Sequence, residues 1–350
     1  MTEDASSPLS PALPREGGGR TEDASSPLSP ALPREGEGRA VVASGSIAFD
    51  YILTFRGRFG DHILPDKAHV INLSFLVDSM QKRRGGVAGN YAYTLALLGH
   101  PAAILATAGA DGAEYRDWLE GLGIDCRGLR ILPEEQTATG FTTTDLNDNQ
   151  ITGYYGGAMN RAGQLGLADT VPAPEAVIVG PNAPDAMFRL VRECRDQGVR
   201  WVWDPAHQLP HMSKQDLEDG GRGAWIVIGN DYEIELVRRR TGRDAAGLLE
   251  LAEMVVTTFG REGSEISTRD GVFRIPAAPP RQEVDPVGAG DAYRAGLVAG
   301  LLEGRGVELA GRIASLAASY AVEQTGTIEH TYTREEFGER FRQVYGEEPW

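Results

Sequence analysis

Lysine is almost absent from this 350-residue chain, which contains only Lys67, Lys82 and Lys214. None of the three follows a glycine, so the sequence holds no Gly-Lys pair of a Walker A phosphate loop. No run of basic residues is longer than three, and the formal net charge is −16. This acidic balance argues against a nucleic-acid partner.

Cysteine and long apolar runs are also scarce. Cys126 and Cys194 stand far apart, without the spacing of a metal site or a redox pair, so we expect buried, reduced thiols. No apolar run approaches the roughly 20 residues of a membrane-spanning helix. The polar N-terminus lacks the apolar core of a signal peptide. These features predict a cytoplasmic protein without a membrane partner.

The first 39 residues are a tandem duplication. Residues 2–20 recur as residues 21–39, with Glu37 in place of Gly18. Each copy is rich in proline, serine and glycine and cannot bury enough apolar surface to offset its ordering entropy. We predict a disordered tail over residues 1–39 and one domain over residues 40–350. A docking role for the tail is the alternative.

Beyond the tail, short apolar runs alternate with helix-length segments. Continuous apolar strands separated by helices are typical of a mainly parallel sheet that is covered on both faces. The pattern predicts a three-layer α/β/α domain, in which ligands bind beyond the carboxyl ends of the strands. The predicted strands are residues 41–45, 176–180, 201–203, 225–228 and 255–258.

Two stretches, about residues 54–84 and 136–158, break this alternation. The threonine-rich residues 137–144, a turn at 145–149 and residues 150–155 predict a β-hairpin. We expect the two stretches to form a small β lid that excludes water during group transfer. A hairpin without a catalytic role is the alternative.

The most informative segment is residues 285–291, a glycine-containing turn that runs directly into an apolar helix-like stretch. Such a turn presents free N–H groups to an anion, and the helix dipole adds to the attraction. A carboxylate there, Asp291, would repel a resting phosphate but can take the proton of a hydroxyl that attacks phosphorus. The segment therefore predicts phosphoryl transfer to an alcohol. An ordinary helix start with an acidic first turn is the alternative.

Two segments offer groups for a sugar. Residues 45–50 end the first predicted strand with a small turn and the carboxylate of Asp50, which can accept hydrogen bonds from a ribose diol. Residues 84–90 contain Gly85 and Gly86, which allow close backbone approach, and Asn90, which can both donate and accept. Capping or turn formation is the alternative role for Asp50.

Two more segments offer groups for a nucleotide. Asn230 and Glu233 follow a predicted strand, share a helix face and can hold a hydrated Mg²⁺. An Asn cap with a first-turn Glu is the alternative. Residues 258–263 follow another strand, and their glycines would let the backbone lie against a nucleotide. An ordinary hairpin turn is the alternative for this segment.

In order and spacing, these segments resemble the ribokinase-like (PfkB) family of ATP-dependent small-molecule kinases. Residues 281–296 are similar to its C-terminal signature and residues 85–99 to its glycine-rich N-terminal one. Asn230 with Glu233 matches its N-x-x-E motif, and residues 258–263 match its T-x-G-x-x-G loop. The resemblance implies a ribokinase-like fold from about residue 40 onward, ATP and Mg²⁺ as cofactors, and a possible homodimer.

Within the family, the chain resembles most the actinobacterial-type adenosine kinases, through residues 45–50, 73–78, 84–90 and 325–327. The resemblance implies adenosine as the alcohol and Asp291 as the catalytic base, with an anion hole made by the N–H groups of Gly288, Ala289 and Gly290. The substrate-binding residues that it implies are Ser46, Asp50, Ser74, Gly85, Gly86, Asn90, Tyr154, His207 and Gln208. The implied nucleotide-binding residues are Asn230, Thr258, Gly260 and Gly263, with Glu233 at the metal through water.

Two positions depart from that subgroup. His207 stands where those relatives tend to have glutamine, and Gly140 where they tend to have an aromatic residue. Both positions are expected to touch the nucleobase. A sugar kinase for ribose or fructose is therefore the alternative, although the aromatic lid favours a flat base. A non-catalytic nucleoside or sugar sensor is a more remote alternative.

Three further expectations concern packing. Arg294 is expected in a surface salt bridge, and Trp201 and Trp203 in the core of the sheet. The helix predicted at residues 308–323 is expected to pack on the core and to flank the ATP adenine.

Overall fold

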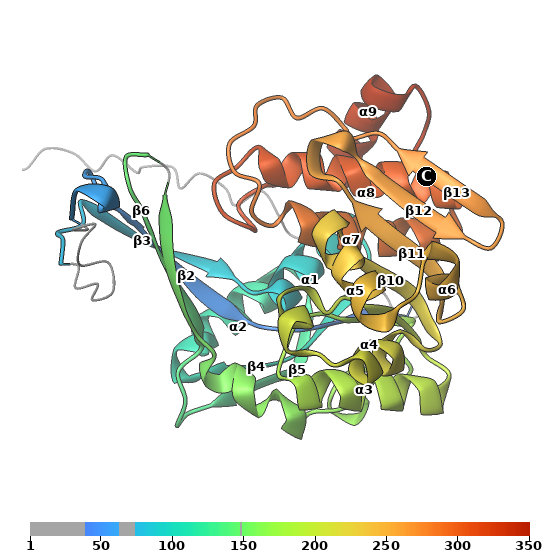
Figure 1. Cartoon of the computed structure of the whole chain (residues 1–350), viewed down its shortest axis with the longest axis horizontal. Coiled ribbons are helices and arrows are strands. Elements are labelled where there is room, and N and C mark those ends of the chain that lie inside the picture. Colours follow the sequence, from blue (N-terminus) through green and yellow to red (C-terminus); the bar gives the residue numbers. More distant parts are fainter. Residues whose placement is uncertain (1–38, 63–73, 148) are drawn as a thin grey trace, which may run out of the picture.

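The computed structural model describes residues 39–62, 74–147 and 149–350 (Figure 1). The predicted tail, apart from its last residue, lies outside the described residues. The described chain forms a nine-stranded sheet in the order β13-β12-β11-β10-β9-β8-β1-β4-β5 and a four-stranded sheet in the order β3-β2-β6-β7. Figure 1 shows the four-stranded sheet, called the small sheet below, projecting to one side of the rest of the domain.

The large sheet is parallel from β11 to β5, as predicted, and only its β12–β13 edge is antiparallel. All five predicted strands are present, and Trp201 and Trp203 are buried in β9. The strands are β1 Val41–Ser44, β4 Ala102–Gly109, β5 Asp125–Leu132, β8 Ala176–Val179, β9 Arg200–Trp203, β10 Ala224–Asn230, β11 Ala252–Thr258, β12 Ser264–Thr268 and β13 Gly271–Ile275.

Helices cover both faces of this sheet and bury one apolar core on each. Alternate side chains of β1 divide between the two cores, because successive residues of a strand point to opposite faces. The predicted three-layer α/β/α ribokinase-like fold is confirmed. One face carries α1 Val87–Leu97, α2 Ala113–Gly121, α7 Ala289–Leu302, α8 Val307–Val322 and α9 Arg334–Tyr345. The other carries α3 Pro184–Gln197, α4 Lys214–Gly221, α5 Asp231–Thr241 and α6 Ala245–Leu249.

Small residues bring α7 and α8 into close contact. A Cβ atom at Gly296 would lie 2.9 Å from the Cα of Ala314, and one at Gly300 would lie 2.9 Å from the Cα of Ala310. Larger side chains at either glycine would push the helices apart. The packing therefore fixes the axis of α7, and with it the position of the glycine turn at its N-terminus.

The small sheet consists of β2 Ala48–Thr54, β3 Ser79–Gly85, β6 Ala138–Thr144 and β7 Gln150–Tyr155. The predicted hairpin is present as β6 and β7. The small sheet begins at Ala48, however, and not near residue 54 as expected. Asp50 therefore lies inside a strand of the small sheet and not in the turn after β1, because only three residues separate β1 from β2.

Cys126 and Cys194 are both buried free thiols, as expected. Burial raises the pKa of each thiol to about 12. In the described part of the chain, every helix is too short or too polar to cross a lipid bilayer.

Candidate active site

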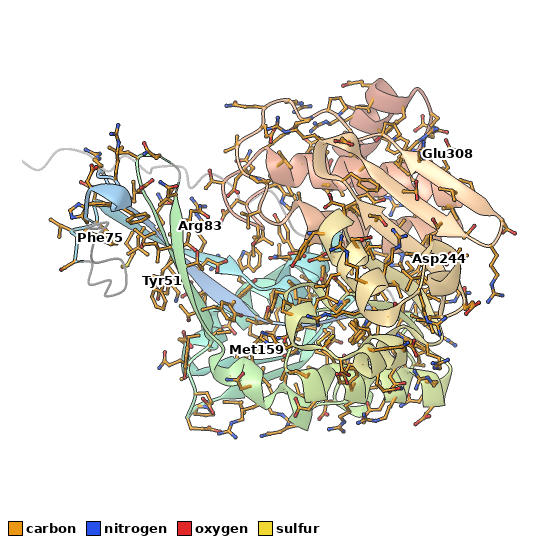
Figure 2. All side chains as sticks on the ribbon, in the orientation of Figure 1. Tyr51, Phe75, Arg83, Met159, Asp244 and Glu308 are labelled. Carbon is orange, nitrogen blue, oxygen red and sulfur yellow. The ribbon has the colours of Figure 1, made fainter. Side chains whose placement is uncertain are left out.

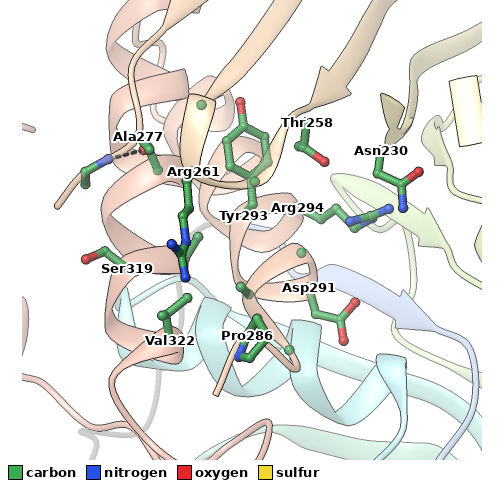
Figure 3. Close-up of a pocket in the computed structure, with 18 of the residues that line it drawn as sticks. Asn230, Thr258, Arg261, Ala277, Pro286, Asp291, Tyr293, Arg294, Ser319 and Val322 are labelled. Carbon is green, nitrogen blue, oxygen red and sulfur yellow. Dashed lines mark hydrogen bonds between the residues drawn. The ribbon is translucent and has the colours of Figure 1, made fainter. Parts of the chain in front are cut away.

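A cavity of about 740 Å³ opens at the carboxyl ends of the central strands. Its walls come from the ends of β9, β10 and β11, from the glycine turn and from α7 and α8 (Figure 3). The structure thus brings segments from the whole C-terminal half together, at the edge of the sheet that the topology predicts. The predicted site residues on its walls are His207, Asn230, Glu233, Thr258, Gly260, Gly263, Gly288, Ala289, Gly290 and Asp291.

The glycine turn forms the N-terminus of α7. Gly288 is the N-cap, with φ 84°, and a Cβ atom there would lie 2.8 Å from the Cα of Thr327. Both the backbone conformation and the close approach require glycine. The N–H of Ala289 donates to the Pro286 carbonyl at 3.2 Å, whereas those of Gly288 and Gly290 make no hydrogen bond within the described residues. Two of the three expected anion-hole donors are thus available to a ligand.

Asp285 holds this turn in place. Its carboxylate accepts hydrogen bonds of 3.0 Å from the N–H groups of Val287 and Gly326. The turn is therefore tied to the chain segment after α8, which fixes its position relative to residues distant in the sequence.

Asp291 lies in the first turn of α7 and faces Asn90 of α1. The Asn90 Nδ2 donates to the Asp291 Oδ2 at 2.7 Å. Burial raises the pKa of Asp291 to about 6, with further upward contributions from Asp204 and Glu233. Arg294 and the Asn90 hydrogen bond act in the opposite direction. A carboxylate with a pKa near the working pH is suited to general-base catalysis.

The expected surface salt bridge of Arg294 is wrong. Arg294 is 7% exposed and pairs with Asp204, which is 1% exposed; its Nη2 donates to the Asp204 Oδ1 at 2.9 Å. Arg294 follows Asp291 by three residues and so shares its helix face, which is turned toward the strand ends. In Figure 3, both side chains leave α7 on the side of Asn230.

Asn230 and Glu233 form the start of α5. The Asn230 Oδ1 accepts from the Glu233 N–H, and the Glu233 Oε2 accepts from the Asn230 N–H, both at 2.8 Å. The two residues thus form a capping box, which agrees with the alternative that Asn230 caps the helix. Both side chains nevertheless also line the cavity. Burial raises the pKa of Glu233. The described residues contain no group of three or more metal-ligating side chains. A single carboxylate fits Mg²⁺ that keeps most of its waters and phosphate ligands.

The segment after β11 is both a hairpin turn and a cavity wall. It reverses the chain into the antiparallel strand β12, while Thr258, Gly260 and Gly263 line the cavity. Opposite them, α8 presents a face of small residues, with Ser315, Ala318, Ser319 and Val322 on the wall. The predicted helix at 308–323 is present as α8, and it packs on the core as expected.

Asp50 lies between two glycines of neighbouring strands in the small sheet. A Cβ atom at Gly85 would overlap the Asp50 Oδ2, and one at Gly140 would lie 2.7 Å from the Oδ1. Burial raises the pKa of Asp50. The structure therefore gives a physical reason for Gly140, because a side chain at this position would displace the carboxylate.

Tyr154 lies near both Ser46 and Asp50, and His207 lies beside Tyr154. Burial raises the pKa of Tyr154; the neighbouring Ser46 hydroxyl lowers it, and the Asp50 carboxylate raises it. The rings of Tyr154 and His207 are 6.5 Å apart. Through Tyr154, the small sheet thus approaches the cavity wall, which His207 lines.

Gly86 is also required at its position. A Cβ atom there would lie 2.5 Å from the Ser46 carbonyl oxygen and 2.6 Å from the Ala48 nitrogen. Gly86 thereby allows the start of α1, which carries Asn90, to pack directly against the start of β2.

Two predicted substrate residues are not brought to this place. Ser74 is exposed and adjoins Phe75, whose ring packs on Phe55 and Phe59. Figure 2 shows Phe75 at the end of the small sheet that is remote from the large sheet. Gln208 is half-buried in the turn after β9 and is not on the cavity wall.

A glycine turn with free N–H groups at a helix start, and a carboxylate with a raised pKa beside it, define an enzyme that transfers phosphoryl groups to an alcohol. The ribokinase-like fold agrees with this class. The model of the pfkB family of carbohydrate kinases matches residues 59–334, and the chain belongs to this family.

Several relatives are similar along most of the chain. A nucleoside kinase of Methanothermobacter thermautotrophicus is 35% identical over 313 residues, which are 88% of this chain and 97% of the relative. A nucleoside kinase of Methanocaldococcus jannaschii is 30% identical over 289 residues, which are 82% of this chain and 91% of the relative. A solved structure of Burkholderia thailandensis nucleoside kinase in complex with inosine has a TM-score of 0.80 and 36% identity, and the match covers 88% and 99% of the two chains.

We expect Gly85→Ala to weaken binding of the alcohol substrate, because the new methyl group displaces the Asp50 carboxylate. The KM for the alcohol should rise at least about tenfold, equivalent to about 1.4 kcal/mol, while the KM for ATP changes little. Steady-state kinetics test this. The control is Gly153→Ala in β7 of the same sheet, where a Cβ atom has no other heavy atom within 4 Å. Equal KM values in the two variants would show that Asp50 does not bind substrate.

Proposed function

We propose that this protein is a nucleoside kinase, which transfers the γ-phosphoryl group of ATP to the primary hydroxyl of a nucleoside, with adenosine as the first candidate. The observation that carries the proposal is the 2.7 Å hydrogen bond between Asn90 and Asp291. It joins a group suited to hold a sugar to a group suited to deprotonate its hydroxyl, at the mouth of the anion site.

A nucleoside is favoured over a bare sugar by two observations. Tyr154 lies near Asp50, and the His207 ring lies 6.5 Å from the Tyr154 ring, so two aromatic rings are at hand for a flat base. Nucleoside kinases also match nearly the full domain, and one of them binds inosine. A sugar kinase is the second candidate, because a Bacillus subtilis ribokinase is 24% identical over 300 residues.

In the proposed complex, Asp50 and Asn90 hold the sugar. The Asp50 carboxylate accepts hydrogen bonds from the ribose hydroxyls. The Asn90 Oδ1 is buried and has no hydrogen-bond partner among the described residues, so it is free to accept from a substrate hydroxyl. Asn90 can thus contact the sugar with its oxygen while its nitrogen orients Asp291.

In the proposed reaction, Asp291 takes the proton of the primary hydroxyl as the oxygen attacks the γ-phosphorus of ATP. The N–H groups of Gly288 and Gly290 and the dipole of α7 stabilise the charge on the transferring phosphoryl group. Mg²⁺ bound with the phosphates would add positive charge there, with Glu233 holding its water shell. Closure of the small sheet, which carries Asp50 and Tyr154, would exclude water.

Release of ADP from MgATP in the presence of adenosine, inosine, guanosine, cytidine, ribose or fructose tests the substrate class. We expect turnover of nucleosides, with adenosine foremost. Asp291→Asn should lower kcat by about 10²–10⁴-fold, because the base is lost. The variant should still bind ATP, which separates loss of chemistry from loss of fold. Turnover of ribose or fructose alone would contradict the nucleoside assignment, and near-native kcat in Asp291→Asn would remove Asp291 from the chemistry.

The raised pKa of Asp291 predicts the pH dependence. Below about pH 6 the carboxyl group is protonated and cannot accept the hydroxyl proton. We therefore expect kcat/KM for the nucleoside to fall toward tenfold for each pH unit below about 6. Circular dichroism at each pH checks that the protein is still folded. A flat profile down to about pH 4.5 in the folded enzyme would contradict the role of Asp291.

A further inference from the structure

The first turn of α7 is joined to the sheet by a buried ion pair that the proposed reaction does not itself use. Besides the bond from Nη2, the Nε of Arg294 lies 2.5 Å from the Asp204 Oδ2. The guanidinium thus donates one hydrogen bond to the carboxylate and lies in ionic contact with its second oxygen, while Nε makes no hydrogen bond among the described residues. Asp204 directly follows β9, so the pair connects the start of α7 to the end of a central strand.

A third residue completes this connection. The Tyr91 hydroxyl donates to the Asp204 Oδ2 at 2.6 Å, and Tyr91 is fully buried. Its neighbour Asn90 donates to Asp291. Two adjacent residues of α1 therefore contact the two groups that determine the position of the α7 start: one contacts Asp291 directly, and the other contacts the partner of Arg294.

The Arg294 guanidinium also touches the anion site. A Cβ atom at Gly290 would lie 2.8 Å from the Arg294 Nη1, so glycine at this position leaves room for the guanidinium as well as for a phosphate. On another side, the Nη2 is 3.7 Å from the Glu233 Oε2. One buried cation thus lies among the anion-hole backbone, Asp204 and Glu233.

A role in packing alone does not account for this arrangement. Buried ion pairs contribute little net stability compared with apolar residues of the same volume. In a water-poor site, however, their charges act strongly on neighbouring groups. We infer that Arg294 and Asp204 are positioning residues for the phosphoryl-transfer step, which hold the first turn of α7, and with it the Asp291 carboxylate, in its orientation against the anion hole. The inference rests on the proposed role of Asp291 as the base.

The groups that face Asp291 come from four elements. They are Arg294 of α7, Asn90 and Tyr91 of α1, Asp204 after β9 and Glu233 of α5. Arg294 lowers the pKa of Asp291, whereas Asp204 and Glu233 raise it. The two members of one ion pair therefore act on the base in opposite directions, and this opposition makes the inference testable.

The test is the pH profile of kcat/KM with MgATP and adenosine, or with whichever panel nucleoside turns over fastest. Arg294→Met should move the acid limb upward by about one pH unit, the lower end of the effect of a neighbouring charge. Arg294→Lys, which keeps the positive charge, should leave the acid limb much closer to its parent position. Asp204→Asn should move the limb downward. If the pair served packing alone, Arg294→Met and Asp204→Asn would both lower the melting temperature, but they would not move the acid limb in opposite directions.

Two further variants keep the test decisive if single variants fold poorly. The double variant Asp204→Asn/Arg294→Met removes both members of the pair together, and its limb should lie between those of Arg294→Met and Asp204→Asn. Arg340→Met is the matched control, because Arg340 is equally buried and pairs with Glu323. Its limb should stay at the parent position. Unshifted limbs in all Arg294 and Asp204 variants, with Asp291→Asn inactive, would overturn this inference but leave the base assignment intact. An active Asp291→Asn would instead overturn the proposed function.

Discussion

The arrangement of the site depends on one constraint, which is that the N-terminus of α7 must stay at a fixed place beyond the sheet. Its anion-binding N–H groups and the Asp291 carboxylate attract and repel the same phosphoryl group, so small displacements would change which effect dominates. Close packing of α7 on α8 sets the helix axis, and Asn90 and Asp204 hold its first turn from two sides. The fold thereby keeps a partly buried carboxylate beside an anion site.

In the proposed complex, the small sheet supplies the other half of the site, through the carboxylate of Asp50. Asp50 occupies the room that Gly85 and Gly140 leave on the two neighbouring strands. This arrangement places a hydrogen-bond acceptor between two glycines, which suits the close approach of a sugar. Under the proposed function, it would also couple substrate binding to the position of the small sheet, because Asp50 is part of strand β2.

Local signals in the sequence were sufficient for the parts of the site that the backbone makes. The turn at Gly288, the start of α5 at Asn230 and the segment around Gly86 each need a residue type that is visible in the sequence. The strands with continuous apolar runs were also predictable. In contrast, β2 follows β1 after three residues, and alternation alone did not separate the two. Arg294 was misassigned because arginine is usually exposed, and its partner Asp204 is 90 positions away in the sequence.

The most direct test of this account is a crystal structure of the enzyme with ADP, adenosine and a metal fluoride that mimics the transferring phosphoryl group. We expect the fluoride ligands to lie against the N–H groups of Gly288 and Gly290. The primary hydroxyl of the nucleoside should lie within hydrogen-bonding distance of Asp291, in line with the fluoride, and the ribose diol should lie on Asp50. A nucleoside bound with its primary hydroxyl away from Asp291, or a fluoride bound elsewhere in the cavity, would contradict the account.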